Sequence, residues 1–105
     1  MKENISEETV LIQFPDFDNL AIFNKLKNMF QLKDCSCHHD SLPSLKKSLE
    51  DNKQLFIFID YKDIKSREYP DTEEFSLLIK NNNDIALDTQ DFENVNDLIQ
   101  YINKL

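Results

Sequence analysis

The chain has 105 residues, 40% of them hydrophobic, and this suits one domain with a modest core. It contains no glycine, which excludes glycine-rich phosphate-binding loops and the glycine-flanked nucleophile of the α/β-hydrolases. The formal net charge of −8 disfavours nucleic acids and anionic membranes as partners and favours basic proteins. We therefore expect a single domain over 1–105, with a disordered or loosely ordered N-terminus at 1–8, no bound nucleic acid and no membrane association.

The first elements in chain order are a strand and a helix. Residues 9–14, Thr-Val-Leu-Ile-Gln-Phe, are rich in apolar and β-branched side chains and stop at Pro15, so they predict a buried strand. Apolar residues then recur at spacings of three, three and four over 20–30, which predicts one apolar face of a helix.

The next segment, 31–49, begins with no regular apolar pattern. Residues 31–40 are irregular, and two alternatives stay open for them: a short strand at 32–37 or a loop. Ser41 and Pro43 are typical of a helix start, because Ser caps the first turn and Pro is tolerated only there. With the leucines that follow, they predict a second helix over 41–49.

The second half begins with the most hydrophobic window of the chain. Residues 55–59, Leu-Phe-Ile-Phe-Ile, predict a central strand that is covered on both faces. Residues 75–79 and 85–87 flank three consecutive asparagines at 81–83 and predict a hairpin, because Asn tolerates positive φ better than most residues with a Cβ. The alternative is a helix over 73–81, whose apolar residues also fit a 3.6-residue period.

The last element is an amphipathic helix that Asn94 caps. Its apolar face holds Val95, Leu98, Ile99, Ile102 and Leu105. The element order β-α-(β)-α-β-β-β-α predicts an α/β fold in which helices pack on a single small sheet.

Four potential metal ligands lie within five residues: Cys35, Cys37, His38 and His39. Zinc sites usually draw ligand pairs from two separate segments, and here there is no second pair, so we expect no metal. A cysteine nucleophile beside these histidines has no identifiable orienting residue, so we expect no catalytic residue, no cofactor and no enzyme activity. Cysteines one residue apart cannot staple distant segments, and the polar N-terminus is unlike a signal peptide; both observations predict a cytoplasmic protein.

Negative charge is concentrated in one stretch of the chain. Residues 68–97 contain nine carboxylates and a single base, Lys80, whereas the remainder holds eleven acidic and eleven basic residues. The whole net charge therefore comes from this segment. It is either a solvated surface or a surface that attracts a basic partner.

Parts of the first two-thirds resemble barstar and related small bacterial toxin-immunity proteins. The stretches that carry the resemblance are V-L-I-Q-F (10–14), N-L-A-I-F-N-K-L-K-N-M-F-Q-L (19–32), D-S-L-P-S-L-K-K-S-L (40–49) and L-F-I-F-I-D-Y (55–61). The resemblance implies an intracellular inhibitor that binds its toxin through the loop before the second helix. The end of the chain, S-L-L-I-K-N-N-N-D-I-A-L-D (76–88) with V-N-D-L-I-Q-Y-I (95–102), resembles the close of a thioredoxin domain, but no C-x-x-C follows the first strand.

From this resemblance and the charge pattern we predict an immunity-type protein that binds a basic toxin domain, plausibly a nuclease, and occludes its active site. An adaptor or subunit module of thioredoxin-like or other α/β fold, without redox activity, is the alternative. The predicted partner-binding residues are Asp34, His38, His39, Asp40, Glu73, Glu74, Asp84, Asp88, Asp91 and Glu93.

Overall fold

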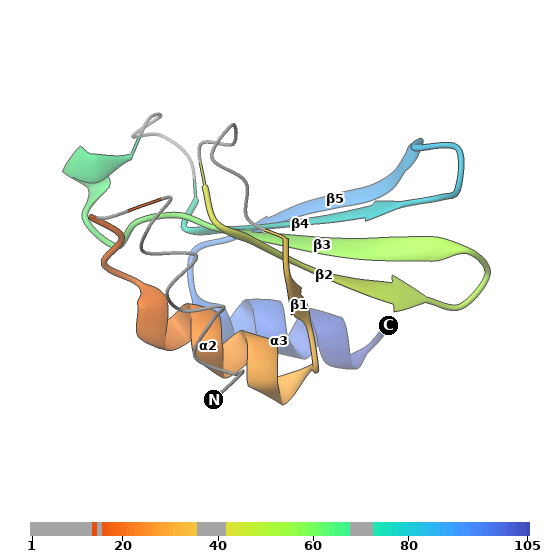
Figure 1. Ribbon diagram of the computed structural model, residues 1–105, viewed down its shortest axis with the longest axis horizontal. Coiled ribbons are helices and arrows are strands. Elements are labelled where there is room, and N and C mark those ends of the chain that lie inside the picture. The colour runs from red at the N-terminus through yellow and green to blue at the C-terminus, as the bar shows by residue number, and fades with distance from the viewer. Residues whose placement is uncertain (1–13, 15, 36–41, 68–72) are drawn as a thin grey trace.

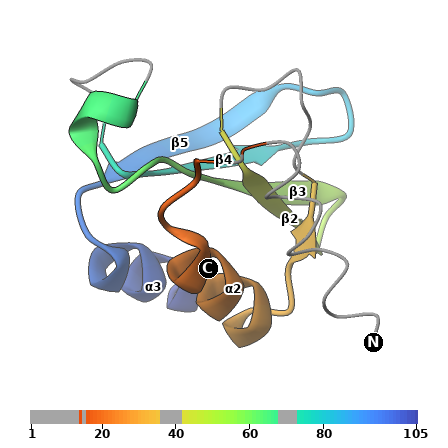
Figure 2. The same cartoon turned by 60° about the vertical axis from the view of Figure 1, so that its left-hand side comes forward.

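In the described part of the chain, the fold is a five-stranded antiparallel sheet with two α-helices on one face (Figures 1 and 2). The computed structural model describes residues 14, 16–35, 42–67 and 73–105. The strands pair in chain order and are β1 (Lys33–Asp34), β2 (Ser44–Leu49), β3 (Lys53–Ile59), β4 (Phe75–Lys80) and β5 (Ala86–Phe92). The helices are α2 (Leu20–Met29), α3 (Val95–Asn103) and the short 3-10 helix η1 (Ile64–Ser66). The predicted fold class, a small sheet with helices packed on it, is confirmed.

The predicted second helix over 41–49 is wrong, because residues 44–49 form strand β2. Leu45 and Leu49 are four residues apart, and this spacing fits a strand period as well as a helical one. The turn decides between the two. Three residues, Glu50, Asp51 and Asn52, separate the paired residues Leu49 and Lys53, and Asp51 and Asn52 both have φ of 62°, so this tight turn folds β2 back onto β3. The Leu-rich helix that the barstar resemblance implies for this stretch is therefore a strand.

The predicted hairpin near the C-terminus is confirmed, and the alternative helix over 73–81 is excluded. The Asn81 carboxamide oxygen accepts hydrogen bonds from the N–H groups of Asn83 (2.9 Å) and Ile85 (3.1 Å) and so organises the turn. The residue with positive φ is Asp84 (65°) rather than an asparagine. The pairing of the strands also shifts by one residue, which leaves Leu87 as an extra residue on β5.

Three more expectations concern a strand at 32–37, the C-terminal helix and a strand at 9–14. The segment 32–37 contains a strand, the two-residue β1, which pairs with β2. The C-terminal helix is confirmed, and the Asn94 carboxamide oxygen accepts the Asp97 N–H as an N-cap (2.9 Å). Residues 1–13, and with them most of the predicted strand 9–14, lie outside the described residues; Phe14 is buried.

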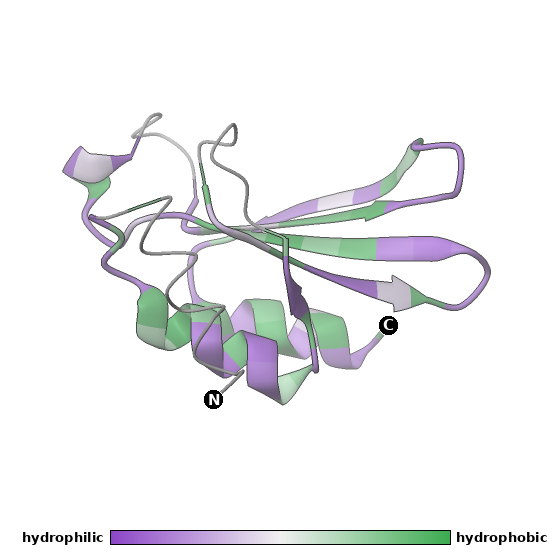
Figure 3. Ribbon diagram, in the orientation of Figure 1, coloured by the Kyte–Doolittle hydropathy of each residue, from purple (hydrophilic) through white to green (hydrophobic). Residues whose placement is uncertain are grey.

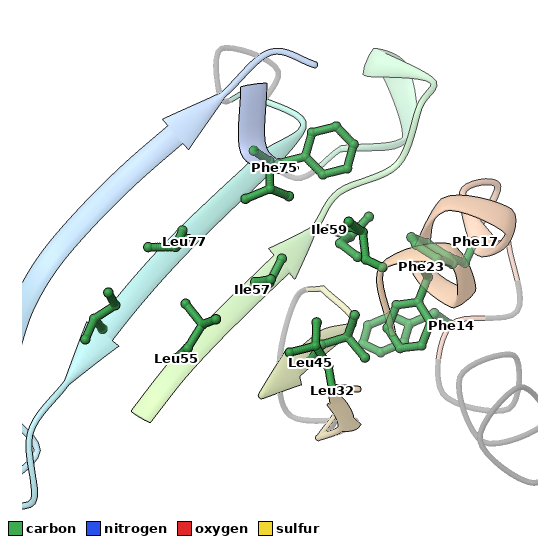
Figure 4. Close-up of a cluster of buried hydrophobic side chains, with 13 residues drawn as sticks. Phe14, Phe17, Phe23, Leu32, Leu45, Leu55, Ile57, Ile59, Phe75 and Leu77 are labelled. Carbon is green, nitrogen blue, oxygen red and sulfur yellow. The ribbon is translucent and has the colours of Figure 1, made fainter. Parts of the chain in front are cut away.

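The core lies between the sheet and the helices (Figure 4). Alternate side chains of β3 and β4 point toward the helices and are buried: Leu55, Ile57, Ile59, Phe75, Leu77 and Ile79. Phe23 and Leu26 of α2 and Leu98 of α3 meet them and are fully buried. The prediction that residues 55–59 are covered on both faces is wrong, since Phe56 and Phe58 on the opposite face are partly exposed.

Hydrophilic residues occupy the β2–β3 and β4–β5 turns and much of β2 and β5, whereas β3 and β4 are mainly hydrophobic (Figure 3). Neither helix in the described part of the chain is long and apolar enough to cross a membrane.

Candidate functional site

Several loops gather at one end of the sheet, which we call the loop end. It comprises residues 14, 16–19, 60–67, 73–74 and 93–94, where β3 stops, β4 starts and both helices begin (Figure 1). Loops held on a rigid scaffold are the usual location of binding residues. This end also collects carboxylates from several segments of the chain.

A buried carboxamide holds the loop end together. Asn19, only 1% exposed, donates from Nδ2 to the main-chain oxygen of Asp60 (3.2 Å) and to Oε2 of Glu74 (2.6 Å). The second carboxylate oxygen of Glu74 lies 3.9 Å from the guanidinium of Arg67. Arg67 in turn donates from Nε to the main-chain oxygen of Tyr61 (2.7 Å). This network fixes the start of α2 to the adjoining ends of β3 and β4.

Asp18 shapes the loop that follows β3. Its two carboxylate oxygens accept the N–H groups of Lys62 (2.7 Å) and Asp63 (3.0 Å). Asp63 then caps η1 by accepting the N–H of Lys65 (3.0 Å). These carboxylates are held in place by main-chain donors, so the negative charge at the loop end has a fixed position.

Tyr61 lies among these carboxylates. Its ring packs edge-on against Phe17, with 5.4 Å between the ring centroids. Burial raises the pKa of Tyr61 above its ordinary value, and the negative charges of Asp16, Asp18 and Asp60 raise it further. A neutral phenol ring surrounded by carboxylates is suited to receive an ammonium or guanidinium group, because both the ring face and the carboxylates attract cations.

The structure brings four of the predicted partner-binding residues to the loop end or next to it. Glu73 and Glu74 precede β4, and Asp91 and Glu93 lie at the end of β5, which pairs with the start of β4. Asp91 accepts a hydrogen bond from the hydroxyl of Ser76 (3.0 Å). Glu74 already binds its own chain, so it contributes charge and structure rather than a free carboxylate.

Two predicted residues lie elsewhere. Asp84 lies in the β4–β5 turn at the opposite end of the sheet, where it pairs with Lys80 at 2.9 Å. Asp88 accepts hydrogen bonds from the hydroxyl of Tyr101 in α3 and from the carboxamide of Gln90. The bond from Tyr101, followed by that from Gln90, lowers the pKa of Asp88 below its ordinary value. Asp88 therefore fastens α3 to β5.

The other four predicted residues lie at or beyond β1. Asp34 is part of this strand and is partly buried, whereas His38, His39 and Asp40 fall outside the described residues. The thiol of Cys35 lies 3.2 Å from the hydroxyl of Ser44. Within the described ranges, no group of three or more His, Cys, Asp or Glu side chains is placed to hold a metal ion.

Sequence reasoning missed part of the loop end, namely Asp16, Asp18, Asp60, Tyr61 and Asp63. These carboxylates lie outside the acid-rich segment 68–97. A usable signal was present: Asp18 lies directly before the predicted helix, and Asp60 directly follows the most hydrophobic strand. Residues at strand and helix termini share one end of a layered fold, so these two positions were candidates for the same site.

Comparison of the chain with protein-family models, with curated proteins and with solved structures gives no match.

Proposed function

We propose that the chain is an immunity-type protein, which binds a basic protein toxin through the loop end and neutralises it by occluding its active site. The observation that supports this most is the position of Tyr61 beside the exposed carboxylates of Asp16 and Asp18 and the buried carboxylate of Asp60, because two separate segments together make this end of the protein negative. Basic toxins that cleave nucleic acids carry a cationic cleft for phosphates. Carboxylates at the loop end would take the place of those phosphates.

Charge acts on the approach of the partner as well as on the final contact. An acidic surface steers a basic protein toward it, and this raises the association rate most at low ionic strength. Three carboxylates at the loop end, those of Asp16, Glu73 and Glu93, make no hydrogen bond or ion pair with other described residues. They are the ones that remain available for direct pairing.

The first candidate partner is a basic toxin domain encoded by a neighbouring gene. We would measure its association with the wild type and with the variants Asp16→Lys and Glu93→Lys, each at low and high salt. Each reversal should slow association by roughly 3- to 10-fold at low salt, and less at high salt. Glu50→Lys makes the same change of charge at the opposite end of the sheet and should affect the rate less. Equal rates for all four proteins would contradict the proposal.

An activity assay separates the inhibitor from the alternative, an α/β adaptor module. One equivalent of an immunity-type protein should abolish the activity of the toxin domain, and the toxin's substrate should compete with binding. An adaptor would bind and leave the partner active. Binding without inhibition would therefore favour the adaptor and contradict occlusion.

A further inference from the structure

Strand β5 is the longest open edge of the sheet. In the part of the chain that the structure describes, the seven-residue strand β5 pairs with β4 alone, through six of its residues, and forms one side of the sheet (Figure 1). The strand at the other side, β1, has only two residues. An edge strand turns alternate N–H and C=O groups outward without partners, and an extended segment of another chain can pair with them.

The two faces beside the β5 edge differ in chemistry. On the face away from the helices lie Thr89 and the exposed Asp91, with Glu93 just beyond the strand. On the helix face an open groove of about 880 Å³ lies below the sheet. Its lining combines apolar side chains, which include Leu55, Ile79, Leu87, Ile102 and Leu105, with charged ones, which include Lys47, Lys53 and Asp88. Leu87 is 49% exposed and Leu105 is 56% exposed, so this groove presents apolar surface to solvent.

The charge around β5 indicates which kind of segment can pair with it. From 81 to 103 the chain holds five carboxylates and no basic residue. Two copies of β5 placed side by side would bring like charges together, which disfavours pairing of the protein with itself. A basic strand would instead place its cations beside Asp91 and Glu93. Because side chains of a strand alternate between faces, its other side chains would point to the groove.

The edge is also held rigid. Tyr101 of α3 donates to Asp88 of β5, and its ring packs against Phe92 with 5.5 Å between the centroids. A strand that is already ordered loses little conformational entropy when a partner strand adds to it. The β5 edge is therefore already in the extended conformation that pairing requires and does not have to fold when a partner binds.

We propose that the β5 edge binds an extended segment of the partner protein in which basic and apolar residues alternate, so that this segment becomes a sixth strand of the sheet. The apolar side chains lie in the groove beside Leu87, and the basic ones pair with Asp91 and Glu93. This inference rests on the proposed function, since Asp91 and Glu93 lie where the β5 edge meets the loop end. It names the secondary structure by which the basic partner docks.

The test uses a ten-residue peptide in which Lys and Val alternate, titrated into the full-length protein and followed by NMR. Amide signals of residues 86–92 should shift, and alternate amides of β5 should exchange more slowly with solvent. The same peptide with N-methyl groups on two adjacent central residues keeps its charge but blocks both of its hydrogen-bonding edges. It should bind at least about tenfold more weakly, since one N–H donor is lost on the edge that faces β5 and the methyl group there prevents close approach of the strands.

A pair of variants tests the position. Asp91→Lys should weaken binding of the peptide about fivefold, as expected for one opposite-charge pair turned into a repulsive pair across strands. Asp16→Lys makes the same charge change away from β5 and should have a smaller effect. Equal affinity for the N-methylated peptide, or shifts confined to 16–19 and 60–63, would overturn pairing at β5. Neither result would affect the association and inhibition measurements that test the proposed function.

Discussion

Replacement of Asn19 by Ala tests whether the buried carboxamide holds the loop end together. The side chain donates one hydrogen bond to a main-chain oxygen, that of Asp60, and one to the carboxylate of Glu74. The first bond stabilises the fold by about 1 kcal/mol and the second, to a charged acceptor, by about 2 kcal/mol. Asn19 Oδ1 is buried with no partner among the described residues, so its removal returns part of this loss. We expect Asn19→Ala to lower the free energy of unfolding by about 2–3 kcal/mol.

Urea unfolding followed by circular dichroism measures this change. The midpoint should fall while the slope with urea stays the same, because the surface exposed on unfolding is unchanged. A loss of this size should lower Tm by about 10 °C or more in a domain of this length. Asn28→Ala, on the exposed side of the same helix, is the matched control and should change stability by less than about 0.5 kcal/mol. If Asn19→Ala were as stable as Asn28→Ala, the network would not stabilise the loop end.

Two further predictions concern α3. Leu98 is fully buried, so Leu98→Ala should lower the free energy of unfolding by about 2–5 kcal/mol. Ile99 is only partly buried, so Ile99→Ala should lower it by less. Equal losses would contradict this difference in burial. The hydrogen bond from Tyr101 lowers the pKa of Asp88, so it stabilises the fold above the ordinary carboxyl pKa, and this contribution disappears as the pH falls through the lowered pKa. The stability difference between wild type and Tyr101→Phe should be present at about pH 6 and shrink toward about pH 3, and a difference independent of pH would contradict the assignment.

The sequence predicts elements well where one period dominates. The apolar residues of α3 follow a helical period over the whole nine-residue helix and do not fit a strand. In 44–49, by contrast, the two leucines satisfy both periods, and Ser41 and Pro43 favour a helix start. The deciding feature is the turn Glu50-Asp51-Asn52, in which Asp51 and Asn52 are residue types that tolerate positive φ and whose three-residue length is common in hairpins. Turn chemistry was the better predictor at this position.

The candidate site was predicted only in part because charge was counted along the chain. In an antiparallel hairpin, residues near its two outer ends lie together, and residues near the turn lie at the other end of the sheet. Glu73 and Glu93 therefore lie at the same end of the sheet, whereas Asp84, between them in sequence, lies at the other end. Asp16 and Asp60, which complete the loop end, come from segments of balanced charge. Asp16 and Asp60 reach the loop end only because of where α2 starts and where β3 stops.

The carboxylates of the loop end are of two kinds: some are bound by donors of their own chain, and others are exposed. Glu74 and Asp18 are bound by donors of their own chain, so a partner cannot take their oxygens without breaking the loop end. Their charge nevertheless attracts a basic protein at a distance, since hydrogen bonding does not remove it. Asp16 and Glu93 are exposed and can pair directly with a cation. In the complex that we propose, the association rate should depend on all these carboxylates, whereas the lifetime should depend on the exposed ones. Comparison of the two rate constants would then separate carboxylates that shape the protein from those that contact the partner.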